Sequence, residues 1–146
     1  MNNQEEISAI AHPNIALAKY WGKKNDELNI PAMDSISITL DTLATTTTVR
    51  IDSTLTQDEF ILNNKKCSEE ERIKISKFLD LFRNKSEIKY FAKVISENNF
   101  PTSAGLASSA SGFAALSIAA NELYQTKLDR KSLSIIARQG SGSAAR

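Results

Sequence analysis

The sequence is poor in the residues that form disulfides and metal clusters. Its 146 residues include one cysteine, Cys67, and one histidine, His12. A single cysteine excludes an intrachain disulfide, and the two residues together match no familiar spacing of metal ligands. We therefore interpret both as incidental residues rather than as parts of a site.

Long apolar runs and an excess of one charge are missing as well. No run of about 18 apolar residues occurs, so no membrane-spanning helix is predicted. Residues 1–7 are polar and acidic, unlike a secretory signal, and we expect a cytoplasmic protein. The 18 basic and 17 acidic residues give a formal net charge of +1. This balance argues against a nucleic-acid binder, although it leaves room for a local basic pocket for a small phosphorylated ligand.

The composition that is present is typical of a globular domain, with 41% hydrophobic and 24% charged residues. The length suffices for one domain with its own core. Strand-like and helix-like patterns mix along the chain without repeats, which predicts an α+β fold. We expect strands at 7–11, 36–40, 45–51, 59–62 and 88–95, with a polar loop at 22–26. The half-buried strand 36–40 is expected to pair antiparallel with 45–51 across a short turn, and Asn63-Asn64 should form the turn after 59–62.

Three helices are also expected. Ser68 and Glu71 have the spacing of a capping box before a helix that ends near Arg83, with an apolar face of Ile73, Phe78, Leu79 and Phe82. An alanine-rich segment from Leu106 to Tyr124 predicts a long buried helix, because Phe113, Leu116, Ala120 and Leu123 recur at helical spacing. Asp129 is the expected N-cap of a last helix from Arg130 to about Arg138.

The segment from Pro101 to Gly112 has the pattern of a phosphate-binding loop. It follows a predicted strand and opens the long helix, where unpaired backbone N–H groups and the helix dipole attract anions. Small residues let a phosphate approach the backbone, and the hydroxyls of Ser108 and Ser109 can bind phosphate oxygens or Mg²⁺. No Gly-Lys-Ser/Thr follows, so the loop is not of the Walker type. Composition alone fits equally well a tightly packed helix start that binds nothing.

Three motifs resemble one known family. The pattern Pro-x-x-x-Gly-Leu-x-Ser-Ser-Ala at 101–110 resembles the phosphate loop of the GHMP kinase superfamily. Ala107 replaces a glycine common in the kinases, and 98–102 looks like the version found in diphosphomevalonate decarboxylases. Residues 13–23 resemble the amino-terminal motif of that family, and 140–146 resemble its serine/arginine substrate motif. The motifs occur in the family's order and span nearly the whole chain.

The resemblance implies a fold, an activity and partners. The fold is a GHMP-kinase amino-terminal domain over residues 1–146, with a mixed or antiparallel sheet and helices on one face. The small-residue ending suggests that a carboxy-terminal domain lies outside this chain. The implied activity is ATP- and Mg²⁺-dependent decarboxylation of mevalonate 5-diphosphate to isopentenyl diphosphate, with ADP, phosphate and carbon dioxide as the other products. Partners would be ATP and that substrate, with neither nucleic acid nor membrane, and members often form homodimers.

The resemblance also assigns roles to residues. Substrate binding would fall to Tyr20, Lys23, Ser141, Ser143 and Arg146, with Arg146 gripping the carboxylate in a bidentate manner. ATP binding would fall to Asn14, Pro101, Ser103, Ala104, Gly105, Leu106, Ala107, Ser108 and Ser109. Catalytic roles would fall to Lys19, Ser109 and Arg146, and Ser109 is a candidate Mg²⁺ ligand. Without the resemblance, the favoured interpretation of Tyr20 and Trp21 is as core or rim aromatics and that of Lys23 is as a solvated cation. A flexible linker is the alternative interpretation of 140–146.

Two departures limit the assignment. Met33 and Asp34 occupy positions where the family commonly has small polar residues, which weakens the choice of substrate. The family's catalytic aspartate lies beyond this chain, and no aspartate here sits in the matching motif: Asp26, Asp34, Asp41, Asp52, Asp58, Asp80 and Asp129. We therefore expect the isolated chain to lack turnover.

Two alternatives stay open: a sister enzyme acting as a mevalonate 3-kinase or on a monophosphate, and a non-catalytic nucleic-acid-binding module.

Overall fold

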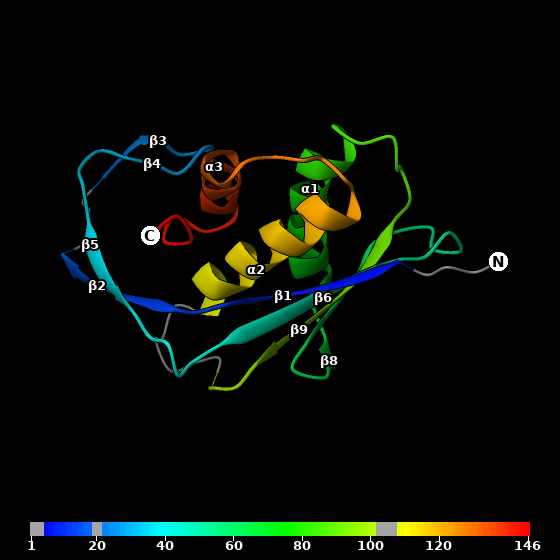
Figure 1. Cartoon of the computed structure of the whole chain (residues 1–146), viewed down its shortest axis with the longest axis horizontal. Helices are drawn as coiled ribbons and strands as arrows, with labels where there is room; N and C mark the ends of the chain where they lie inside the picture. Colours follow the sequence, from blue (N-terminus) through cyan, green and yellow to red (C-terminus); the bar gives the residue numbers. More distant parts are fainter. Residues whose placement is uncertain (1–4, 19–21, 102–107) are drawn as a thin grey trace.

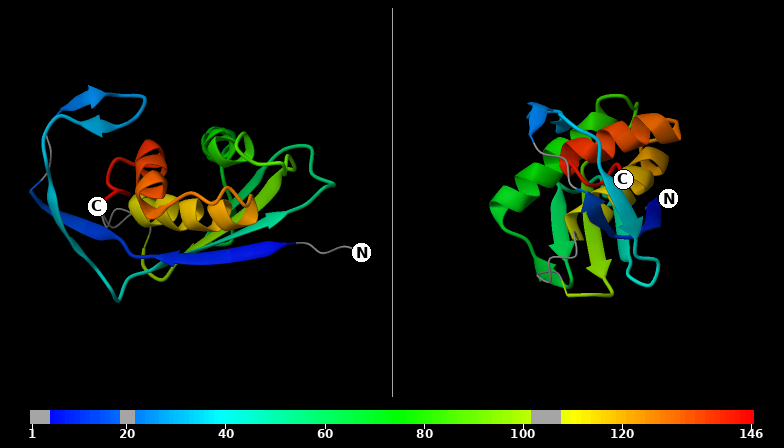
Figure 2. Two further views of the ribbon diagram at one scale, coloured as in Figure 1. Left: turned by 45° about the horizontal axis from the view of Figure 1, so that its top comes forward. Right: turned by 90° about the vertical axis from the view of Figure 1, so that its left-hand side faces the viewer.

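The computed structural model describes residues 5–18, 22–101 and 108–146, which form a curved sheet with three helices on one face (Figure 1 and Figure 2). Five strands lie in the order β1-β6-β9-β7-β8. Their bounds are β1 Glu6–Ala11, β6 Thr45–Ile51, β9 Ala92–Asn98, β7 Glu59–Leu62 and β8 Lys65–Lys66. β7 runs parallel to β9 and the other pairs are antiparallel. The predicted α+β class, with a mixed sheet covered on one face, is confirmed.

The helices are α1 Glu69–Arg83, α2 Ser108–Leu123 and α3 Arg130–Gly140. The capping box of α1 is present: Ser68 Oγ accepts from Glu71 N, and Glu71 accepts from Ser68 N. Asp129 caps α3 by accepting from Ser132 N. Both predicted caps are confirmed. In each, a side-chain oxygen accepts from a backbone N–H that has no partner within the helix. The α3 helix continues two residues past the expected end.

The core forms where the inward faces of β6 and β9 meet α1 and α2. Along β6 the side chains alternate, so Thr45, Thr47 and Val49 are buried and their neighbours are not. Val49 pairs with Val94 of β9, and both are fully buried. The largest side chains of the core come mainly from the helices: Leu79, Phe82, Leu116, Leu123 and Tyr124. The predicted apolar face of α2 is confirmed, because Phe113, Leu116, Ala120 and Leu123 are all buried.

The predicted pairing of 36–40 with 45–51 is wrong. β5 (Ile36–Thr39) pairs instead with β2 (Asn14–Ala18) in a separate two-stranded sheet, while β6 pairs with β1 and β9. The alternating pattern fixes the two faces of a strand but not its partner. The expected burial is also wrong, because Ile36 and Ile38 are 65% and 52% exposed. Across the pair, Asn14 is buried and Ala16 and Ser37 are half-buried.

Three further expectations need correction. Residues 22–26 are partly extended: β3 (Lys23–Asn25) pairs with β4 (Ile30–Pro31) as a small hairpin. Ile73 is 40% exposed, and Ile75 takes the buried position, because Ile73 lies five residues before Phe78 and so on another side of the helix. The strand expected at 88–95 begins only at Ala92, since the residues between α1 and Ala92 form turns and irregular structure.

No helix in the described parts of the chain is long and apolar enough to cross a membrane.

Candidate functional site

The two flanks of the predicted phosphate loop are held firmly. Before the loop, Asn99 accepts from Ala44 N at 2.8 Å and donates to Thr42 O at 3.1 Å. Asn98 accepts from Thr45 Oγ1 at 2.6 Å. After the loop, Ser111 on the first turn of α2 lies 2.6 Å from the same Thr45 hydroxyl. Both flanks are therefore anchored to the start of β6, and the first N–H groups of α2 are fixed in direction.

Three separate segments meet at a group of serines beside this helix start. Ser109 Oγ, on α2, lies 3.2 Å from Ser141 Oγ, and Ser141 Oγ lies 3.4 Å from Ser143 Oγ. From β2, Asn14 Nδ2 donates to Ser143 O at 3.0 Å. We call Asn14, Ser109, Ser141 and Ser143 the serine cluster. The predicted ATP-binding residues Asn14 and Ser109 and the predicted substrate-binding residues Ser141 and Ser143 therefore lie together, although the chain separates them by up to 129 positions.

Asn14 carries an unused acceptor within this cluster. The residue is 5% exposed, and its Oδ1 has no hydrogen-bond partner among the residues that the structure describes. A buried acceptor without a partner is costly, so the site favours a donor arriving from a ligand or from another part of the protein.

The segment after α3 is a hydrogen-bonded turn. Ser141 N donates to Ala137 O, Ala144 N donates to Ser141 O, and Arg146 N donates to Ser143 O. Ala144 packs against the core. The interpretation as a flexible linker is therefore wrong, because these bonds fix the backbone that carries Ser141, Ser143 and Arg146.

Lys23 lies on the β3–β4 hairpin. Its Nζ is 3.8 Å from Asp26 Oδ1, in an exposed pair. The hairpin is docked on the end of α3, because Asn29 Nδ2 donates to the carbonyls of Arg138 and Gln139 at 3.1 Å each. The hairpin that carries Lys23 is therefore anchored on the end of α3, just before Ser141. No described contact joins the ammonium of Lys23 to the serine cluster.

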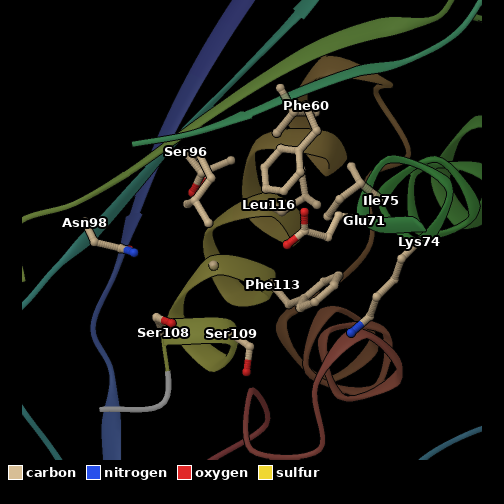
Figure 3. Close-up of a pocket in the computed structure, with 14 residues that line it drawn as sticks. Phe60, Glu71, Lys74, Ile75, Ser96, Asn98, Ser108, Ser109, Phe113 and Leu116 are labelled. Carbon is tan, nitrogen blue, oxygen red and sulfur yellow. The ribbon is translucent and has the colours of Figure 1, made fainter. Parts of the chain in front are cut away.

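A pocket of about 190 Å³ opens beside the start of α2, between the sheet and α1 (Figure 3). Ser108, Ser109 and Gly112 form one end. The walls are apolar, and the polar and charged lining comprises Thr47, Glu71, Lys74, Ser96 and Asn98. Asn98 Nδ2 is buried and has no acceptor among the described residues. The pocket thus offers apolar walls, the unused amide donor of Asn98 and the helix start that follows the predicted phosphate loop.

Several predicted residues fall outside the described ranges. Lys19, Tyr20 and Trp21 lie there, as do Ser103, Ala104, Gly105, Leu106 and Ala107. Pro101 is described and exposed, directly before the loop. Met33, at the position that departs from the family pattern, is 61% exposed.

The described residues contain no group of three or more His, Cys, Asp or Glu side chains that could hold a metal ion. Serine hydroxyls and the phosphate oxygens of a nucleotide are oxygen ligands of the kind that Mg²⁺ accepts. Ser109, at the helix start and facing the serine cluster, fits that role.

Two features of the site were not predicted from the sequence: the anchoring bonds of Asn98 and Asn99 before the loop, and the position of Lys74 beside the pocket. The dipeptide Asn98-Asn99 at the end of a strand is the signal that indicates a loop anchor, because asparagine side chains bond nearby backbone groups. Lys74 gives no such signal, since a lysine on a helix is ordinarily solvated.

The mixed sheet, the helices on one face and the anchored flanks of the loop before α2 define an α+β domain of the GHMP-kinase amino-terminal type. The chain belongs to the diphosphomevalonate decarboxylase-like N-terminal domain family, whose model matches residues 11–146. The family resemblance seen in the sequence is thereby confirmed.

Individual relatives agree with this assignment. The chain is 44% identical to diphosphomevalonate decarboxylase of Debaryomyces hansenii, over 95% of this chain and 39% of that protein. Mevalonate diphosphate decarboxylase from Staphylococcus aureus is 51% identical, with a TM-score of 0.90 over 97% of this chain and 43% of that one. A solved structure of MDDEF in complex with MVAPP, AMPPCP and magnesium is 50% identical, with a TM-score of 0.87 over 97% of this chain and 43% of that one. The chain therefore spans about two fifths of the length of these relatives.

Proposed function

We propose that this chain is the ATP- and substrate-binding part of an ATP-dependent diphosphomevalonate decarboxylase. The observation that carries the proposal is the contact of Ser109 with Ser141, 3.2 Å between hydroxyl oxygens, since it joins the helix start of the phosphate loop to the serine/arginine segment. A nucleotide bound at the first and a mevalonate derivative bound at the second would have their reacting groups side by side. Family membership favours this function over a nucleic-acid-binding module.

The pocket suits the nucleoside end of ATP. A purine is flat and largely apolar, which matches walls formed by Phe60, Leu62 and Leu116. The amide of Asn98 can donate to a ring nitrogen or ribose oxygen, which would satisfy its buried N–H. The phosphates would then extend to the start of α2, where backbone N–H groups and the hydroxyls of Ser108 and Ser109 can bind them.

The serine cluster suits the mevalonate end. Its hydroxyls and the unused Oδ1 of Asn14 can bind the hydroxyl and the carboxylate of a 3-hydroxy acid. Arg146 would hold the carboxylate, and Lys23 with Tyr20 would hold the diphosphate. Phosphorylation of the tertiary 3-hydroxyl makes a good leaving group, and its departure drives the loss of carbon dioxide. Bound Mg²⁺ would neutralise the charge on the transferred phosphoryl group.

We further propose that this chain binds both ligands without turning them over. The aspartates with described side-chain interactions bond elsewhere: Asp58 and Asp80 to Arg83, Asp52 to Thr54, Asp26 to Lys23 and Asp129 to Ser132. None of them lines the pocket or touches the serine cluster. The group that removes the proton from the 3-hydroxyl would then belong to the longer protein.

The test is calorimetric titration of the chain with Mg·ATP and with mevalonate diphosphate. Ser109→Ala and Ser141→Ala should each weaken binding of the ligand on their own side about tenfold. Ser53→Ala, at an exposed turn after β6, is the matched control and should bind as the wild type does. Wild-type protein that binds neither ligand would overturn the proposal. Titration with mevalonate and its monophosphate distinguishes the sister enzymes, because each would prefer its own substrate.

A further inference from the structure

Three hydrogen bonds dock the β3–β4 hairpin on the end of α3. Asn29 Nδ2 donates to Arg138 O and to Gln139 O, and Arg138 Nε donates to Leu28 O at 3.2 Å. The hairpin and the helix therefore each supply both a donor and an acceptor. Figure 1 and Figure 2 show the tip of the hairpin beside α3, away from the five-stranded sheet.

Asn29 suits this contact in its backbone and in its side chain. Its φ of 49° lies in the left-handed region, which asparagine adopts more readily than most residues. Its amide supplies two N–H donors, and the last carbonyls of a helix have no partners within the helix. Residues 22–28 are all exposed, whereas Asn29 is half-buried. The attachment of the hairpin to the helix therefore depends on Asn29.

Lys23 is linked to Asn29 through the hairpin itself. Lys23 is the first residue of β3, which pairs antiparallel with β4, and Ile30, the first residue of β4, directly follows Asn29. Across the turn, Asn25 Oδ1 accepts from Leu28 N at 2.8 Å. A displacement of Asn29 from the helix would therefore move Lys23 as well.

The α3 side of the contact leads directly into the serine cluster, because Ser141 is the second residue after Gln139. The segment from Ser141 is also held by bonds that do not involve the hairpin: Ser141 N donates to the last turn of α3, and Asn14 Nδ2 donates to Ser143 O. The serines are thus fixed with or without the hairpin, whereas the hairpin depends on Asn29. Asn29 thereby sets the separation between the ammonium on the hairpin and the serine cluster.

We propose that Asn29 is a positioning residue that makes the site selective for the length of its substrate. The inference rests on the proposed function, in which Lys23 holds the diphosphate and the serine cluster holds the 3-hydroxy acid. Two binding groups at a fixed separation favour the ligand whose ends reach both, because neither group then has to be ordered on binding. A ligand without the terminal phosphate engages only the serine end. The contact at Asn29 therefore favours mevalonate diphosphate over mevalonate and its monophosphate.

Asn29→Gly removes both amide donors, and glycine adopts the same φ without strain. The variant should weaken binding of mevalonate diphosphate about tenfold, weaken binding of the monophosphate less, and change binding of mevalonate by less than about twofold. Arg138→Met removes the third hydrogen bond and should change the three affinities in the same direction. Asn64→Gly is the matched control, because Asn64 has a φ of 62° and is exposed on the turn between β7 and β8. It should bind all three ligands as the wild type does.

Calorimetric titration of the full chain with the three ligands measures the preference for the diphosphate, and urea unfolding verifies that each variant is folded. A preference in Asn29→Gly equal to that of the wild type would overturn the inference and leave the proposed function intact. An equal loss for all three ligands would also overturn it, since that result points to a general loosening of the site. Wild-type protein that binds none of the three would remove the proposed function and this inference together.

A double-mutant cycle with Lys23→Met separates positioning from a purely structural role. If Asn29 acts by placing the ammonium of Lys23, Asn29→Gly should have little further effect on binding of mevalonate diphosphate once that ammonium is absent. A full loss of about tenfold in the Lys23→Met background would show that Asn29 acts by another route and would overturn the inference.

Discussion

Gly140, the last residue of α3, lies so close to Phe113 that a Cβ at residue 140 would stand 2.1 Å from Cδ1 of the ring. Phe113 is 7% exposed and packs against the ring of Phe78, with 4.8 Å between the ring centres. The ring therefore cannot move aside freely. This close approach sets the distance between the turn that carries Ser141 and the helix that carries Ser109. Packing therefore requires a glycine at residue 140, the first position of the segment 140–146.

Gly140→Ala should lower the free energy of unfolding by about 1–3 kcal/mol, the usual cost of overpacking a filled core. Gly112→Ala is the matched control, since nothing lies within 4 Å of a Cβ at residue 112. That change lies in the interior of α2 and should stabilise the protein by about 1 kcal/mol through helix propensity. Urea unfolding of both variants measures the difference. Equal stability of Gly140→Ala and the wild type would show that Phe113 yields at no cost.

A buried ion pair closes the opposite end of the core. Arg83, at the end of α1, donates to Asp58 at 2.6 Å, and the side chains are 8% and 1% exposed. The carboxylate of Asp58 also accepts from Ser76 Oγ and from Ala92 N. Arg83 pairs in addition with Asp80 and donates to the backbone of Tyr90. The cluster thereby ties the start of β7 and β9 to α1.

Removing one partner of this pair should be far more costly than removing both. Arg83→Met leaves a buried carboxylate without its cation, and we expect a loss of about 3–5 kcal/mol in the free energy of unfolding. The double variant Asp58→Asn with Arg83→Met should lose less than the sum of the two single changes. Lys93→Met is the control: its partner Glu59 is 3.7 Å away and both are partly exposed, so the loss should stay below about 1 kcal/mol. Strict additivity in denaturant unfolding would contradict the coupling.

Tyr124 should make stability fall at alkaline pH. Burial raises the pKa of its phenol, and the nearby Arg83 partly opposes the shift. A folded-state pKa above the unfolded value of about 10 means that the unfolded chain loses the proton first. The contribution of the group is therefore fully present below about pH 10 and is lost as the pH rises through the folded pKa. Unfolding of the wild type and of Tyr124→Phe, measured at about pH 8 and about pH 11, isolates it. The stability of the variant should fall less steeply, and parallel pH profiles would contradict the prediction.

Patterns read within one segment predicted local structure well. The capping box at Ser68, the N-cap at Asp129 and the apolar face of α2 are all present, because each depends on residues within one or two turns of each other. Partner choice was not predictable in the same way. The strand from Ile36 pairs with β2 rather than with its neighbour β6, since register and partner follow from contacts across the whole sheet.

Some residues of the candidate site could likewise be identified from a sequence pattern, and others could not. Ser109, Ser141 and Ser143 were identified through the resemblance to a family, and the structure brings them together. Lys74 was missed because its position beside the pocket depends on how α1 packs against α2, which no motif records. The pair Asn98-Asn99 at the end of a strand is a local signal that the sequence does contain. The unpaired Nδ2 of Asn98 follows only from the structure, because the bond from Thr45 to Oδ1 fixes the orientation of the amide.

The outward face of the β2–β5 sheet gives the last prediction. Ile15, Leu17, Ile36 and Ile38 are 43%, 66%, 65% and 52% exposed, although apolar side chains on one face of a strand pair usually point to a core. Ile38→Thr keeps a β-branched side chain and removes little buried apolar area, so it should cost below about 1 kcal/mol in the free energy of unfolding.

Val49→Thr is the matched comparison for Ile38→Thr. Val49 is fully buried at the centre of β6, and the new hydroxyl would lose its contact with water, so a loss of about 1–3 kcal/mol is expected. Both variants should be unfolded in urea at two protein concentrations. If Ile38→Thr cost as much as Val49→Thr, and the cost grew with protein concentration, the face would be covered in solution by a second copy of the chain. A small cost that does not depend on concentration would show that this apolar face is open to water in the isolated chain, since exposed side chains contribute little to folding.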